Sequence, residues 1–137
     1  MLFSAKAEYA CLAMLELAAR YGDPRPVRLA DVADKHGIPQ RFLVQILLQL
    51  KGAGLVDSTR GAAGGYHLAR PPADVSLADI LSVVDRSDAP EPKPDASPLA
   101  ATLHTVWERL YAARARVLRD TSLAGLVEAG QGLQYVI

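Results

Sequence analysis

Apolar side chains recur at helical spacing near the start of the chain, and this pattern predicts two helices there. The first extends from Ser4 to about Tyr21, where a Gly-Asp-Pro sequence ends it. The second is short and covers Leu29–Lys35. It is followed by Gly37, which can adopt the left-handed conformation that often ends a helix. The apolar stripe expected on the first helix consists of Ala7, Cys11, Met14, Leu15 and Ala18.

A third helix is predicted over Gln40–Lys51, after Pro39, which is tolerated at the start of a helix. Gly52 and Gly54 end it. The side chains expected on its buried face are Phe42, Leu43, Ile46, Leu47 and Leu50. The opposite face carries Gln40, Arg41, Val44, Gln45, Leu48 and Lys51.

Two short apolar segments follow, and they favour a β-hairpin. Leu55–Ser58 and Gly65–Leu68 flank the basic, glycine-rich loop Thr59–Gly64. Further along, Ser76-Leu77-Ala78-Asp79 has the spacing of a capping box and predicts a fourth helix that ends near Val84.

The second half of the chain contains a proline-rich stretch and then a heptad pattern. Residues 86–98 include four prolines and no large apolar side chain, which is typical of a linker or mobile loop. The apolar residues beyond it recur at heptad spacing on a helix of about 20 residues. They are Leu99, Leu103, Val106, Leu110, Ala113 and Val117. A long helix beyond a linker has little of its own domain to pack against, so we expect it to pair with the same helix of a second chain.

Three helices followed by a hairpin with a basic loop is the element order of a winged helix-turn-helix. The expected fold is mainly α with a small β-hairpin wing. It comprises a DNA-binding domain over residues 1–85, the linker 86–98, and a dimerisation helix with a C-terminal segment over 99–137. In such a fold the third helix enters the major groove and the wing reaches the adjacent backbone or minor groove.

The residues expected at this interface differ in what they can recognise. Gln and Arg side chains of the third helix can pair with base edges. Lysines and arginines elsewhere suit phosphate, the wing glycines allow close approach of the backbone, and Arg60 can enter a narrow minor groove. The residues expected to contact DNA are Ser4, Lys6, Arg28, Gln40, Arg41, Gln45, Lys51, Arg60, Gly64, Gly65, Tyr66 and His67.

The overall charge first argues against a nucleic-acid partner, but its distribution reverses that conclusion. The 137 residues have a formal net charge of zero. Residues 1–72 hold nine basic and six acidic side chains, and the remainder holds six basic and nine acidic ones. The predicted DNA-binding half therefore carries a charge of +3. With no long apolar run, no signal-peptide pattern and one cysteine, we expect a cytoplasmic protein that does not enter a membrane.

Five segments of the chain resemble the bacterial transcription regulators typified by the iron–sulfur cluster regulator IscR, the nitric-oxide sensor NsrR and the cysteine-metabolism repressor CymR. The wing segment Arg60–Pro71, preceded by Ala53–Val56, is the most specific of these. The others are Ala7–Ala10, Phe42–Leu47, His104–Trp107 and Thr121–Ala124. The resemblance implies a homodimer that binds palindromic double-stranded DNA, usually as a repressor, with the long C-terminal helix as the dimer element.

The chain departs from these regulators where many of them hold an iron–sulfur cluster. It has no cysteine between Arg86 and Pro98, and Cys11, its one thiol, lies on the apolar stripe of the first helix. Glu8 and His104 fall where some relatives place cluster ligands, but without thiolates they cannot hold a cluster. We therefore expect neither a cofactor nor a metal site. Val44 stands where several relatives have glutamate, so their operator sequence need not apply.

Two alternatives to an operator-binding repressor follow from the same residues, and a third, an enzyme, does not. The small charge of the first half is compatible with a winged module that docks a partner enzyme or another regulator. Glu8 and His104 are compatible with a residual metal or small-ligand sensor. An enzyme is disfavoured, because no nucleophile and base can be paired from the sequence.

Overall fold

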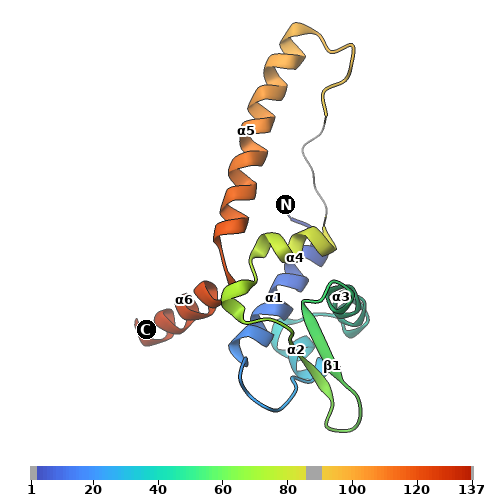
Figure 1. Ribbon diagram of the computed structural model, residues 1–137, viewed down its shortest axis with the longest axis vertical. Coiled ribbons are helices and arrows are strands. Elements are labelled where there is room, and N and C mark those ends of the chain that lie inside the picture. Colours follow the sequence, from blue (N-terminus) through green and yellow to red (C-terminus); the bar gives the residue numbers. More distant parts are fainter. Residues whose placement is uncertain (1–2, 86–90, 137) are drawn as a thin grey trace.

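The computed structural model describes residues 3–85 and 91–136, with only the backbone of 132–136. Figure 1 shows a compact body from which one long helix extends. The body begins with α1 (Ala5–Ala19), α2 (Leu29–His36) and α3 (Gln40–Gly52), followed by strands β1 (Val56–Thr59) and β2 (Gly65–Leu68). The predicted winged helix-turn-helix order, mainly helical with a two-stranded hairpin, is confirmed.

Helix α1 passes through the centre of the body and begins at a serine cap. The Ser4 hydroxyl accepts a hydrogen bond from the Ala7 backbone N–H at 3.1 Å, which satisfies one of the free donors of the first turn. Its fully buried face is built mainly from small residues: Ala7, Ala10, Ala13, Met14, Leu17 and Ala18. Cys11 and Leu15 of the predicted stripe are half-buried and pack against the core. Small side chains let neighbouring elements approach α1 closely, and its buried face includes Ala10, Ala13 and Leu17, which lie outside the predicted stripe.

Helix α3 packs on this core through Leu43, Ile46, Leu47 and Leu50, each at most 1% exposed. Phe42, predicted to belong to this face, is 56% exposed, so that prediction was wrong. Successive residues of a helix are about 100° apart, which puts Phe42 roughly a quarter turn from the centre of the buried face. Phe42 therefore lies at the edge of the buried face, and its side chain is exposed at the surface of α3.

The strands form a hairpin with a third backbone segment beside it. β1 and β2 pair in antiparallel register from Val56 with Leu68 to Thr59 with Gly65. Val27, from the loop between α1 and α2, exchanges two backbone hydrogen bonds of 2.8 Å with Tyr66. Strand β2 is therefore paired with the segment that enters α2 as well as with β1.

Two shorter elements follow the wing. The 3-10 turn η1 (Pro72–Asp74) leads into α4 (Leu77–Val84). The predicted capping box is confirmed at the start of α4, where the Ser76 and Asp79 side chains each accept a hydrogen bond from the other residue's backbone N–H, at 3.1 and 2.9 Å.

Helix α5 (Pro98–Asp120) extends from the body, and α6 (Leu123–Val136) then returns to it (Figure 1). The return is fixed by two backbone hydrogen bonds, from Leu77 N–H to the Thr121 carbonyl at 3.0 Å and from Leu123 N–H to the Val75 carbonyl at 2.9 Å. Leu123 is fully buried, and α6 packs against α1 and η1. The sequence predicted α5 but not α6.

The proposed division into residues 1–85, 86–98 and 99–137 stays a prediction. Residues 86–90 of the predicted linker lie outside the described residues. At its other end Ser97 caps α5 by accepting a hydrogen bond from the Ala100 backbone N–H at 3.2 Å. Among the described residues, no helix combines the length and apolar character needed to cross a membrane.

Candidate nucleic-acid interface

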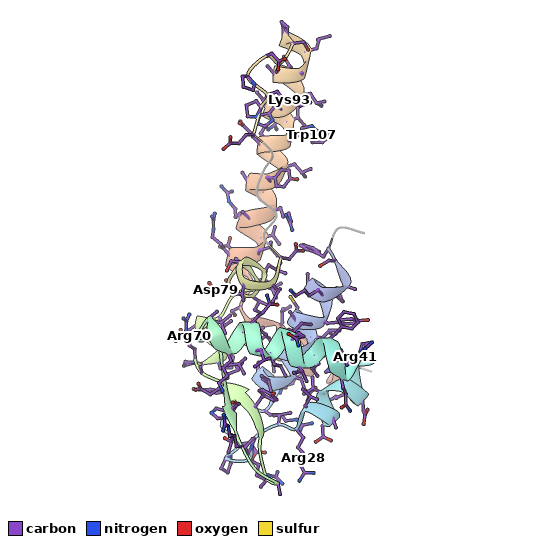
Figure 2. All side chains as sticks on the ribbon, turned by 90° about the vertical axis from the view of Figure 1, so that its right-hand side faces the viewer. Arg28, Arg41, Arg70, Asp79, Lys93 and Trp107 are labelled. Atoms are coloured by element: carbon purple, nitrogen blue, oxygen red, sulfur yellow. The ribbon has the colours of Figure 1, made fainter. Side chains whose placement is uncertain are left out.

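The face of α3 opposite its buried leucines is open to solvent. Gln40, Arg41 and Gln45 are all exposed on it, and Figure 2 shows Arg41 at the surface near the start of the helix. None of these three side chains has a hydrogen bond or ion pair with any described residue. Because the other side of α3 is fixed in the core, their direction relative to the body is set by packing, and their polar groups are available to an external partner.

The local charge of this face is positive. From Lys35 to Val56 the sequence contains no aspartate or glutamate, while Arg41 and Lys51 add cations on α3 itself. A helix surface without acidic residues, next to a basic loop, attracts a polyanion even though the whole chain is neutral. The sequence predicted a basic N-terminal half, and part of that positive charge lies on this face of α3.

Lys51 fixes the wing strand relative to α3. Its ammonium donates a 2.7 Å hydrogen bond to the Ser58 hydroxyl on β1. The predicted phosphate-binding residue thus joins the last turn of the predicted recognition helix to the wing, and its ammonium retains further donors for an external acceptor.

Arg28 links the wing tip to the start of α2. Its Nη2 donates to the Ala62 carbonyl at 3.3 Å, while the rest of the side chain is exposed. In Figure 2 it lies at the end of the molecule farthest from the tip of α5, beside the wing turn. With Lys51, it gives the wing two side-chain contacts to the body, one at the turn and one on β1.

The wing turn itself exposes Arg60, whose guanidinium has no partner among the described residues. The adjacent glycines have an intramolecular role. A side chain at Gly64 would place its Cβ 2.2 Å from the Thr59 carbonyl oxygen, and one at Gly65 would place it 2.4 Å from the Val27 oxygen. Only glycine allows the turn to close and β2 to lie this near Val27. Tyr66 is half-buried beside Val27, and His67 is exposed.

Ser4 and Lys6, also predicted to contact DNA, lie at the start of α1. The Ser4 hydroxyl caps the helix and lies 3.4 Å from an Asp85 carboxylate oxygen. Lys6 is half-buried. Among the described residues no hydrogen bond or ion pair joins either side chain to α3 or to the wing.

A buried carboxylate, missed by the sequence reasoning, joins the first two helices. Glu16 is 4% exposed and is paired with Arg20 at 3.0 Å, Lys35 at 3.1 Å and His36 at 2.9 Å. Burial alone would raise the pKa of Glu16, but hydrogen bonds from His36, Lys35 and Arg20 outweigh it and leave the pKa below its usual range. The cluster fixes α2, and hence the approach to α3, against α1.

The predicted dimer face is unpaired in the single chain. Leu99, Leu103, Val106, Leu110 and Val117 are between 46% and 84% exposed, Ala113 is also exposed, and α5 has no buried residue. Trp107, labelled on the projecting part of α5 in Figure 2, is 41% exposed. A row of large apolar side chains on an isolated helix is characteristic of an interaction surface.

Glu8 and His104, the predicted effector residues, are not brought together within one chain. Glu8 is exposed on α1, whereas His104 pairs with Glu108 of its own helix, Nε2 to Oε1, at 3.2 Å. No hydrogen bond or ion pair joins the two. In the part of the chain that the structure describes, no group of three histidine, cysteine or acidic residues could hold a metal ion.

The thiol chemistry does not fit an iron–sulfur cluster either. Burial, and then the nearby Glu8 carboxylate, raises the pKa of Cys11 to about 11, so the group is a neutral thiol at physiological pH. Cluster irons are held by several thiolates, and the sequence provides one cysteine.

The chain matches a family model over residues 3–129: Rrf2, described as an iron-dependent transcriptional regulator. It is 42% identical over 130 residues to an HTH-type transcriptional regulator of Mycobacterium tuberculosis, covering 90% of this chain and 80% of the relative. Among solved structures it is similar to CymR, the global cysteine regulator of B. subtilis. The TM-score is 0.82 at 33% identity, and the match covers 93% of this chain and 96% of CymR. It is also similar to T. potens IscR, with a TM-score of 0.83 at 36% identity, covering 96% of this chain and 90% of IscR.

Proposed function

The chain belongs to the Rrf2 family of transcriptional regulators, and on this premise we propose that it is a homodimeric repressor that binds a palindromic operator. The observation that carries the proposal is the exposed surface of α3 and the wing. This surface has no acidic residue on α3 and presents Arg41, Gln45 and Arg60, whose side chains have no partner among the described residues.

The roles proposed for these residues follow from their positions. Gln40, Arg41 and Gln45 read base edges in the major groove, where Gln pairs with adenine and Arg with guanine. Lys51 and Arg28 contact phosphates while they fix the wing, and Arg60 enters the neighbouring minor groove. This arrangement separates residues that carry sequence information from residues that supply affinity.

The dimer follows from the exposed row of apolar residues on α5. None of the twenty-three residues of α5 is fully buried, and its exposed apolar row adds little apolar burial to an isolated chain. A second copy of α5 would cover that row and relate the two α3 helices by a two-fold axis. A two-fold protein binds a palindrome, with its half-sites one or more helical turns apart.

The signal is proposed to be something other than an iron–sulfur cluster. The family model is described as iron-dependent, but this chain supplies a single thiol with a raised pKa. The proposed regulator therefore has no resident cofactor, and its effector differs from that of the cluster-binding relatives.

The proposal is tested by measuring affinity for the DNA upstream of the protein's own gene as a function of salt. Affinity should fall steeply with added salt, and it should exceed the affinity for random duplex by at least about 1000-fold. Arg60→Ala should weaken binding to both duplexes, whereas Gln45→Ala should weaken only the specific complex. Equal affinity for the two duplexes, or no dependence on salt, would contradict the proposal.

A further inference from the structure

Two large apolar side chains lie on the exposed face of α3, among the polar residues proposed to contact DNA. Leu48 is 54% exposed and Phe42 is 56% exposed, and neither belongs to the hydrophobic core. Large apolar groups gain free energy when a partner covers them, so their presence among the proposed DNA contacts makes them candidates for contact with the partner of α3.

The surroundings of Leu48 and Phe42 indicate the kind of partner. Arg41, Gln45 and Gln49 lie among them on the exposed side of the same helix, and none of the three has a partner among the described residues. No acidic residue occurs anywhere on α3. The projecting part of α5 lies at the other end of the molecule from the wing (Figure 2), so pairing of two copies through α5 would leave α3 uncovered. A polyanion that presents both polar edges and small apolar groups fits this surface.

The major groove of B-DNA presents one such apolar group, the C5-methyl of thymine, which apolar side chains contact. Resting on the proposed operator binding, we infer that Leu48 and Phe42 read thymine methyl groups, and that Gln45 and Gln49 pair with adenines beside them. The half-site under α3 is therefore rich in A·T pairs.

The geometry of the helix separates the two contacts. Leu48 follows Phe42 by six positions, which is about 9 Å along the axis at 1.5 Å per residue and about 120° around it, so the two side chains leave α3 in different directions. At roughly 3.4 Å per base step, the two side chains meet thymines between two and three steps apart. Each contact can then be removed independently.

The test removes methyl groups without changing base pairing. Duplexes selected by the purified protein from a random library are copied twice by the polymerase chain reaction, once with dTTP and once with dUTP. Burying one methyl corresponds to about fourfold in affinity, so losing two methyl contacts in each of two half-sites should weaken binding of the wild-type protein to the uracil copy by up to roughly 250-fold. Single thymine-to-uracil replacements should then locate two sensitive positions in each half-site.

Variants of α3 assign the methyl dependence to side chains. Leu48→Ala and Phe42→Ala should each lose sensitivity at one position, and the double variant should bind the two copies equally. Gln45→Ala is the matched control on the same face: it should bind both copies more weakly and keep the ratio. Because Leu48 and Phe42 are exposed, thermal unfolding of these variants should stay at the wild-type temperature.

The outcomes separate this inference from the proposed function. Specific binding with equal affinity for the two copies would overturn the methyl contacts and leave operator binding intact. An unchanged ratio in the double variant would also overturn them, since the dependence would then come from duplex shape. A wild-type protein that does not prefer selected duplexes to random ones would contradict both.

Discussion

Glu16 illustrates how one residue can determine the position of a functional element without touching the interface. Its carboxylate, 4% exposed, holds three basic side chains that are more exposed than itself, two of them from α2. Because the carboxylate is the buried member, its charge is stabilised only while those partners remain in place.

We predict that Glu16→Gln lowers the free energy of unfolding by about 1.5–3 kcal/mol at neutral pH, the usual range for hydrogen bonds to a charged group. The pKa of Glu16 is lowered in the folded state, so its contribution is present above the usual pKa of 4.5 and is lost as pH falls through the folded value. The difference between wild type and variant should therefore shrink as the solution is acidified below about pH 4.5.

Urea unfolding at a series of pH values measures this difference directly. Asp34→Asn is the matched control, because Asp34 is exposed on α2 and has no hydrogen bond or ion pair with a described residue, so its loss should leave the free energy of unfolding unchanged. A gap between wild type and Glu16→Gln that stays constant down to pH 3 would show that the charge of Glu16 does not stabilise the fold.

Cys11 should be unreactive in the native protein. Because burial raises its pKa to about 11, the thiolate that reacts with iodoacetamide is scarce at neutral pH. We expect alkylation to be much slower in the folded protein than in urea, and to accelerate as pH rises toward 11. Alkylation at neutral pH as fast in the folded as in the unfolded chain would contradict this.

At the residue scale, the sequence predicted what depends on near neighbours. The spacing of Leu43, Ile46 and Leu50 identified the buried side of α3, because helical periodicity is local. The partners of Glu16 could not be predicted, since Lys35 and His36 reach it from another helix. Phe42 was misplaced because it lies at the edge of the stripe, where periodicity alone does not separate buried from exposed positions.

Among the elements, the wing depends most on a single close approach. β2 lies against Val27 only because Gly65 has no side chain. We predict that Gly65→Ala displaces the wing, lowers the free energy of unfolding by about 1–3 kcal/mol and weakens operator binding.

Gly130→Ala in α6 is the matched control, because nothing lies within 4 Å of the position its Cβ would occupy. It should leave operator binding unchanged and leave stability unchanged or slightly higher, as expected for alanine in a helix. Urea unfolding and operator affinity of the two variants measure the contrast. Equal behaviour would show that the contact with Val27 does not hold the wing.

The elements also show where sequence reasoning stops. The Ser76–Asp79 capping box and the heptad pattern of α5 were sufficient to predict α4 and α5, since both signals lie within the element. Helix α6 contains Gly125, Gly130 and Gly132, which lower helix propensity, and its start is fixed by backbone hydrogen bonds of Thr121 and Leu123 with Leu77 and Val75. Those contacts join distant parts of the chain and leave no local pattern.

At the scale of the whole molecule, α5 determines whether two DNA-binding surfaces act together. We predict that Leu110→Glu converts the protein from dimer to monomer, because it would place a carboxylate in the covered apolar row. In the single chain Leu110 is 57% exposed, so the variant should still fold. Sedimentation equilibrium measures the change in mass.

Ala101→Glu is the matched control for this prediction. Ala101 is exposed on α5 but lies on the side of the helix away from Leu110. The control should remain a dimer and bind the operator with wild-type affinity, whereas Leu110→Glu should bind it much more weakly. Two variants with the same mass and affinity would contradict dimerisation through this face.

The central claim is that two copies of the α3–wing surface bind one operator, and a footprint tests it most directly. Genomic fragments retained by the purified protein would be cleaved chemically in its presence. The account predicts two protected half-sites of inverted sequence, separated by whole helical turns of about 10–10.5 base pairs, with protection weakened by Arg60→Ala. Protection of a single half-site, or no protection at a concentration that saturates the retained fragment, would contradict it.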